Sequence, residues 1–372
     1  MENTSQLHVD YFTIEATEID GTGLETGTET HSDIPFHHRA IVASVLIGLT
    51  LIGLFGNTLV IIAVVVTKKL RTITNILLVN LAFADLVTCL CIPFQVVGLL
   101  SQAEGYPLRD FVCATVAGVF ITCICCSSST LALISIVRWY VITKFVRGQR
   151  GFHSPKKIAT LVVIIWIVSV ALMVVPPVLG IGTLGYSQYY SLCCTTDTNP
   201  LDYYYVTIQG TVVAVNLTLT IMFYILIWLH VLQHNKHFRD KYDIKEENSS
   251  HAAQSKDSSV SRESCPPMIQ SIKRKEIQIT KNLFMVVCVF VFCFLATSIY
   301  LLIPGTSVFT FYSIMLLSAN SVVNPIIYGL KHPNFQEVFQ RTFRCVWVYA
   351  PWTIVRGSKT APGPDQRQPI VL

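Results

Sequence analysis

The chain has 372 residues, of which 52% are hydrophobic and only 13% are charged, and its formal net charge is +5. Ordinary soluble domains carry about a quarter charged residues, so the composition excludes a soluble protein whose apolar helices are covered by a polar shell. The net positive charge does not indicate nucleic-acid binding either, because the basic residues gather between apolar segments, as they do in membrane proteins.

Seven apolar segments are long enough to cross a bilayer, since about 20 residues of helix span a hydrocarbon core of about 30 Å. These segments are residues 40–66, 75–100, 111–140, 158–181, 203–231, 276–303 and 308–330. We therefore predict an all-α membrane protein in which seven transmembrane helices form one bundle over residues 40–330.

The segment before the first span is acidic and polar, with no apolar run typical of a removable signal peptide. We expect a disordered extracellular tail over residues 1–39, with Asn3 glycosylated in its Asn-Thr-Ser sequon. Basic residues follow spans one, three and seven and precede span six. The positive-inside rule then places the N-terminus outside and the C-terminus in the cytoplasm, in a multi-pass protein of the plasma membrane.

Two further segments are expected in the cytoplasm. Residues 233–271 are polar and serine-rich ("SKDSSVSRES"), which predicts a flexible, phosphorylatable loop. After span seven, Phe335, Val338 and Phe339 fall on one helical face, which predicts a short amphipathic helix on the membrane surface within residues 331–345. A cytoplasmic tail, residues 346–372, follows. Cys345 is a candidate for palmitoylation, the alternative being an unmodified thiol.

Most of the twelve cysteines lie inside spans, where a thiol behaves as a small apolar side chain. Cys113, Cys193 and Cys194 lie on the outer side, which faces an oxidising compartment. One disulfide is therefore expected between Cys113 and one of the two adjacent cysteines, and the sequence leaves the choice between them open.

Polar residues inside the spans need partners, because an unpaired polar group in hydrocarbon is costly. Asp85 cannot face lipid as a carboxylate, so we expect it to share a sodium ion or a water cluster with amides and hydroxyls from other spans. A static hydrogen-bonded contact between helices is one alternative, and an ion-coupled transporter is another, although the chain lacks the repeated halves usual in transporters. The candidate residues are Asn57, Asp85, Ser127, Asn320 and Asn324.

These features resemble the rhodopsin-like (class A) G-protein-coupled receptors over residues 40–345. The resemblance is carried by "GNTLV" with Asn57, "NLAFADLV" with Asp85, Trp166, and "NPIIY" in span seven. "NFQEVF" is similar to the family's eighth helix, and Cys113 precedes Arg138 by 138 − 113 = 25 positions, as in the family. The stretch "KKLRTITNILLVNLAFADLV" is also loosely similar to melatonin receptors and to orphan relatives.

The resemblance implies that Arg138 is the arginine of the family's Asp-Arg-Tyr signature, here flanked by Val137 and Trp139. Glu276 occupies the position of a second acidic partner, and an Arg138–Glu276 pair would hold the resting state. We expect either a loosened latch with raised basal signalling or compensation by packing around Val137. The other activation residues that the resemblance implies are Tyr224, Phe290, Phe294, Asn324, Pro325 and Tyr328.

The chain departs from the family at three positions in the moving helices. Phe294 replaces a tryptophan, Ala296 replaces a proline, and Asn216 stands where the family usually carries proline. Because proline removes a backbone hydrogen bond and kinks a helix, spans five and six are expected to be straighter here.

The resemblance also implies a ligand site in the outer halves of the spans. Phe120 stands where amine receptors carry an aspartate, so a monoamine ligand is not expected, and span seven lacks the lysine of an opsin. The pocket suits a neutral or apolar small molecule, whereas the tyrosine-rich rim ("YSQYYS", "LDYYYV") suits a peptide or an interfacial belt. The implied pocket residues are Gln95, Phe120, Ile124, Gln209, Thr297, Ser298, Ile314 and Ser318.

We therefore expect a class A receptor that couples an extracellular ligand to a heterotrimeric G protein through repacking of spans five, six and seven. It would be no enzyme, since no nucleophile–base pair or metal cluster is present in the sequence, and a sodium ion is the one cofactor considered. Membrane lipids, and arrestin at the phosphorylated loop of residues 233–271, are further expected partners. The alternatives are an uncoupled decoy or heteromer partner and, less expected, the ion-coupled transporter.

Overall fold

The computed structural model describes residues 34–102, 105–144, 154–196, 198–251, 284–285, 287–295, 307–331 and 335–340. Several sequence-based expectations lie outside these residues and stay predictions. They concern the tails of residues 1–33 and 346–372, residues 252–271, and Asn3, Glu276, Thr297, Ser298 and Cys345.

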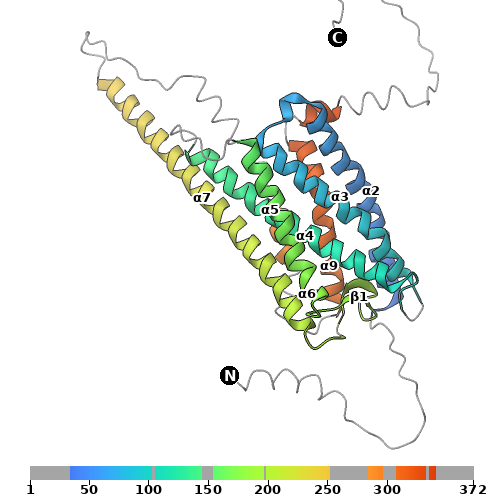
Figure 1. The fold of residues 1–372 in the computed structure, drawn as a ribbon. Coiled ribbons are helices and arrows are strands. Elements are labelled where there is room, and N and C mark those ends of the chain that lie inside the picture. The colour runs from blue at the N-terminus through green and yellow to red at the C-terminus, as the bar shows by residue number, and fades with distance from the viewer. Residues whose placement is uncertain are drawn as a thin grey trace, which may run out of the picture.

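Long helices packed roughly alongside one another dominate the structure (Figure 1). Six helices in the described part are long and apolar enough to cross a membrane, and residues 284–285 and 287–295 of the remaining predicted span are helical. Among the described residues, the helices with defined bounds are α2 (Phe36–Val66), the 3-10 helix η2 (Lys68–Leu70), α3 (Ile73–Leu100), α4 (Asp110–Lys144), α5 (Pro155–Met173), α6 (Val175–Val178), α7 (Asp202–His251) and α9 (Ser307–Lys331).

The fourth predicted span ends earlier than expected as a regular helix. The sequence predicted residues 158–181, but α5 ends at Met173 and only the one-turn α6 follows. Pro176 and Pro177 explain the break, because a proline offers no amide hydrogen and its ring clashes with the preceding turn.

The membrane-spanning part of the fifth predicted span, Asp202–Gln233, agrees with the prediction, but its helix continues beyond it. Helix α7 continues 251 − 231 = 20 residues past the predicted end at 231, so the first part of the expected flexible loop is helical. No glycine or proline occurs between Thr211 and His251, and the polar extension is rich in lysine and glutamate, which are good helix formers. Figure 1 shows this extension projecting beyond the neighbouring helices.

The loop between the fourth and fifth spans forms a β-hairpin that the sequence did not predict. Strand β1 (Leu184–Ser187) pairs antiparallel with β2 (Leu192–Thr195), with Tyr186 opposite Cys193. Both strands contact α4, and β2 also contacts α3. The hairpin therefore lies against the outer ends of two transmembrane helices.

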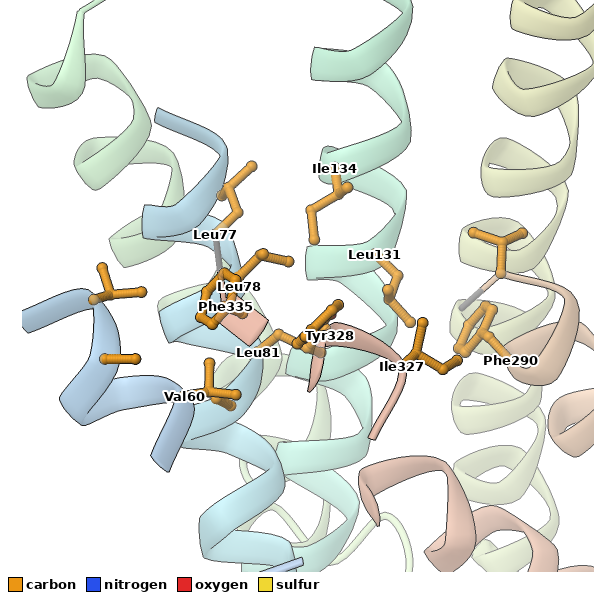
Figure 2. Packing of buried hydrophobic residues seen from close by; sticks show 14 of the residues in the cluster. Val60, Leu77, Leu78, Leu81, Leu131, Ile134, Phe290, Ile327, Tyr328 and Phe335 are labelled. Atoms are coloured by element: carbon orange, nitrogen blue, oxygen red, sulfur yellow. The ribbon is translucent and has the colours of Figure 1, made fainter. Parts of the chain in front are cut away.

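The larger apolar cluster lies toward the other end of the bundle and joins residues from all the long helices with the short helix of residues 335–340 (Figure 2). Phe335 is fully buried and its ring centroid lies 6.1 Å from that of Tyr328 in α9. Glu337 is exposed and forms an ion pair of 3.9 Å with Lys69. The short helix thus turns its apolar face toward the bundle and its polar face outward.

Candidate functional site

A group of polar side chains meets in the middle of the bundle around Asp85, which is fully buried on α3. Ser127 of α4 donates a hydrogen bond to Asp85 Oδ1 at 3.1 Å, and Asn324 of α9 donates one to Asp85 Oδ2 at 2.7 Å. The carboxylate therefore ties three helices together. Asn320 is also buried but makes no hydrogen bond to Asp85 within the described residues.

Asn57 connects α2 to the same region. Its Nδ2 donates to the carbonyl oxygens of Gly53 (3.0 Å) and Ser321 (2.9 Å), while its Oδ1 is buried without a hydrogen-bond partner in the described part of the chain. The close approach of α2 depends on glycine: a Cβ atom at Gly56 would lie 2.8 Å from Pro325 Cγ. Small residues allow such helix contacts in membranes.

A second polar network, which includes residues that sequence reasoning missed, joins α3, α4 and α5. Trp166 Nε1 donates to Asn80 Oδ1 at 2.8 Å, and Asn80 Nδ2 donates to Thr130 Oγ1 at 2.8 Å. Trp166 was recognised as a motif residue, but its partners were not, because pairing across helices depends on the rotation of each helix. Few residues of α5 are buried, and this network holds α5 against α3 and α4.

At the opposite end from the hairpin, Arg138 of α4 is buried and lies near Tyr224 of α7. The adjacent Trp139 packs edge-on against Phe223 of α7, with ring centroids 5.6 Å apart. Val137 is buried in the apolar cluster of Figure 2. The position that holds an acid in the family's signature is therefore filled by apolar packing.

Two tyrosines of the expected switch bring buried hydroxyl groups to this end. Tyr224 and Tyr328 are both buried, and neither hydroxyl has a hydrogen-bond partner among the described residues. A buried unpaired hydroxyl costs free energy, so both groups gain if a rearrangement or a water molecule supplies a partner.

Two of the departures from the family pattern, Phe294 and Asn216, lie among the described residues. Phe290 and Phe294 are buried with ring centroids 4.3 Å apart. Asn216 of α7 donates through Nδ2 to Ser128 Oγ and to Ser129 Oγ of α4, each at 3.0 Å. The amide that stands in place of proline thus makes an interhelical contact that the sequence alone did not reveal.

On the outer side, the disulfide joins Cys113 to Cys193, and the adjacent Cys194 is half-buried and lies outside this disulfide. Gln95 of α3 holds the same strand: its Oε1 accepts from the Cys193 amide at 2.7 Å and its Nε2 donates to the Cys193 carbonyl at 2.8 Å. Gln209 of α7 donates to Thr195 Oγ1 at 3.2 Å. Both expected pocket amides therefore contact the hairpin.

The other expected pocket residues are placed in part. Phe120 is buried in an apolar cluster with the disulfide and Tyr106, and Ile124 packs against both this cluster and the one in Figure 2. Ser318 of α9 is buried. The side chain of Ile314 lies outside the described residues, and no group of three or more His, Cys, Asp or Glu within those residues is arranged to hold a metal ion.

A family model described as "7 transmembrane receptor (rhodopsin family)" matches residues 56–328. The chain belongs to the rhodopsin family of seven-transmembrane receptors. The resemblance seen in the sequence motifs is thereby confirmed, and with it the multi-pass membrane fold. Members of this family are receptors and not enzymes.

Individual relatives of this receptor agree with the assignment. It is 26% identical over 350 residues to melatonin receptor type 1B-B of Danio rerio, which covers 91% of this chain and 90% of that protein. It is 28% identical over 323 residues to the lateral eye opsin of Limulus polyphemus, covering 81% and 78%. The crystal structure of squid rhodopsin has the same fold, with a TM-score of 0.68, 18% identity, and coverage of 88% of this chain and 92% of that one.

Proposed function

We propose that this receptor transduces binding of an extracellular ligand to a heterotrimeric G protein. The observation that carries the proposal is the placement of Arg138, buried at the end of α4 away from the disulfide, with Tyr224 close by. In the proposed mechanism, repacking of α7, residues 284–295 and α9 frees the guanidinium to contact the G protein and to give the tyrosine hydroxyls a partner.

The test is ligand-free G-protein activation in cells across a panel of G-protein subtypes, at matched surface expression. Wild type is compared with Arg138→Ala and with Lys156→Ala, an exposed basic residue at the start of α5. A basal signal that Arg138→Ala abolishes and Lys156→Ala retains supports coupling. Silence of all three, with normal surface delivery, contradicts raised basal activity. Adding extracellular ligands then distinguishes a ligand-dependent receptor, which they activate, from the uncoupled decoy or heteromer partner, which they do not.

The level of basal signalling depends on how the missing acid before Arg138 is compensated. The Arg138–Glu276 pair remains part of the proposal, and about 1 kcal/mol from such a pair shifts a two-state equilibrium roughly fivefold. Burial of Val137 in the apolar cluster supports compensation by packing. The ligand-free signal in the cellular assay therefore decides between raised basal activity and compensation by packing.

The ligand is proposed to be a neutral or apolar small molecule, or a peptide, and not a monoamine. Phe120 occupies the position of the amine-binding aspartate and packs among apolar groups, which leaves no anion there for a ligand ammonium. The matched opsin does not imply retinal for this chain, because no lysine occurs between Ser307 and Leu330 of α9 to form a Schiff base.

We also propose that Asp85 and its neighbours bind a sodium ion that modulates the receptor. The residues fit such an ion: Asp85 supplies a carboxylate, Ser127 a hydroxyl, and Asn57 Oδ1 is a buried acceptor without a partner in the described part of the chain. Sodium prefers oxygen ligands of this kind, and a positive charge would offset the cost of burying the carboxylate.

Plasma-membrane orientation is proposed with the hairpin outside. The Cys113–Cys193 disulfide supports this, because disulfides persist in an oxidising compartment, as do the basic residues Lys68 and Lys69 at the other end of the bundle. We also propose glycosylation of Asn3, palmitoylation of Cys345 and recruitment of arrestin.

A further inference from the structure

Arg39 lies buried near the outer end of α2, with 7% of its surface exposed. Its Nη1 donates two hydrogen bonds of 3.0 Å, one to the carbonyl oxygen of Ser101 at the end of α3 and one to Ser191 Oγ in the hairpin turn. Its guanidinium carbon lies 5.5 Å from the centroid of the Phe36 ring. Uncharged groups thus fix the guanidinium in place.

The other edge of the same guanidinium is unused. Nε is buried without a hydrogen-bond partner, and Nη2 makes no hydrogen bond to any described residue. No ion pair to Arg39 occurs in the described part of the chain. The Nε and Nη2 hydrogens form the parallel pair of donors that suits a carboxylate, and a buried cation without an anion is costly.

The groups around Arg39 position its guanidinium but do not neutralise its positive charge. Ser191, whose hydroxyl accepts from Arg39, has φ 54°, an uncommon value for a residue other than glycine. Next to Arg39 in the sequence, His38 Nδ1 lies 2.8 Å from Tyr312 Oη, and this hydrogen bond links α2 to α9. The ring centroids of His37 and His38 lie 4.3 Å apart. None of these neighbours is an acid.

We propose that Arg39 forms an outer subsite for a carboxylate group, bound through Nε and Nη2 while Nη1 keeps its contacts with Ser101 and Ser191. Two sources offer this chemistry. One is a free extracellular ligand with a carboxylate. The other is one of the three acidic residues of the chain that precede α2 most closely, Glu25, Glu29 and Asp33, of which Asp33 stands six positions before Arg39. The subsite uses neither Gln95 nor Phe120 and does not depend on G-protein coupling.

The experiment uses the full-length receptor in nanodiscs of zwitterionic lipid, with sodium acetate as the probe at fixed sodium concentration and ionic strength. A ligand that binds the folded state raises the melting temperature in a saturable way. We expect this rise for wild type, its loss in Arg39→Gln, and at least a several-fold weaker affinity in Arg39→Lys, which keeps the charge but lacks the fork. Arg109→Gln, which removes an exposed arginine ahead of α4, should respond as wild type does.

A variant with Glu25→Gln, Glu29→Gln and Asp33→Asn distinguishes the two sources. Tighter acetate binding than in wild type, or a response seen only in this variant, identifies the N-terminal segment as the occupant, and an unchanged response indicates a free ligand. The proposal is overturned if neither wild type nor this variant responds, or if Arg39→Gln melts earlier yet keeps the full acetate response. If Arg39→Gln fails to fold, the proposal is overturned when Arg39→Lys binds acetate as tightly as wild type does.

Discussion

Gln95 and Cys193 are joined by two hydrogen bonds, one in each direction, between a side-chain amide of α3 and the backbone of β2. The same cysteine is covalently bound to Cys113 of α4. A single strand residue is therefore fixed to two transmembrane helices at once, and the hairpin takes its position from this point.

Gln95→Ala should destabilise the receptor more than loss of an ordinary side-chain contact. The substitution leaves the Cys193 amide and carbonyl buried and unpaired, and each such group costs about 1–3 kcal/mol. Gln209→Ala is the matched control, because it removes one bond of 3.2 Å to a side-chain hydroxyl. Melting curves of the purified variants provide the measurement, and equal losses for the two would contradict the assigned role.

The two adjacent cysteines should behave differently on substitution. Cys193→Ser removes the disulfide and should cost about 2–5 kcal/mol, seen as a large loss of surface delivery. Cys194→Ser changes a half-buried cysteine outside the Cys113–Cys193 disulfide and should leave surface delivery and melting temperature close to wild type. Peptide mapping of the non-reduced protein checks the pairing, and a Cys113–Cys194 peptide would show the assignment to be wrong.

Asn216→Ala should loosen the contact between α7 and α4. Interhelical hydrogen bonds in membranes contribute on average about 0.6 kcal/mol and up to about 1.7 kcal/mol, which corresponds to a shift between two packings of roughly threefold to twentyfold. If the bonds to Ser128 and Ser129 belong to the resting packing, basal signalling rises by about this factor. Thr218→Ala, a substitution at an exposed residue two positions along α7, is the control. An unchanged basal signal in Asn216→Ala would show that these hydrogen bonds do not stabilise the resting packing.

Asp85→Asn should abolish the dependence of stability on sodium. The substitution keeps the shape of the side chain but removes the charge that attracts the ion, while Ser127 and Asn324 remain. Wild type should melt at a higher temperature in sodium chloride than in choline chloride, and Asp85→Asn should melt equally in both. A sodium response that survives in the variant would place the ion elsewhere.

The sequence predicted the bundle and much of its polar interior. Long apolar segments located the spans, and the cost of a carboxylate in hydrocarbon identified Asp85 as a point where helices converge; its bonds to Ser127 and Asn324 agree with that inference. The family motifs then identified Arg138, which the structure places in a buried position at the end of the bundle away from the hairpin.

Features that depend on register or on three-dimensional neighbours were not predictable in the same way. The choice between Cys193 and Cys194 follows from the alternation of side chains along β2 and from the bonds made by Gln95. The asparagine at 216 suggested only a missing kink, because its partners lie 88 and 87 residues away on another helix. The extension of α7 to His251 was missed because hydropathy marks where a span leaves the membrane and not where its helix ends.

Coupling to G proteins through Arg138 is measured most directly by nucleotide exchange on purified heterotrimeric G proteins, catalysed by the receptor reconstituted in nanodiscs. We expect wild type to accelerate exchange on at least one G-protein subtype, and we expect Arg138→Ala, with an unchanged melting temperature, not to do so. Equal acceleration by both proteins would contradict the role given to Arg138. No acceleration of any subtype by a correctly folded wild type, with or without extracellular ligands that bind it, would contradict the proposal that the receptor couples to G proteins.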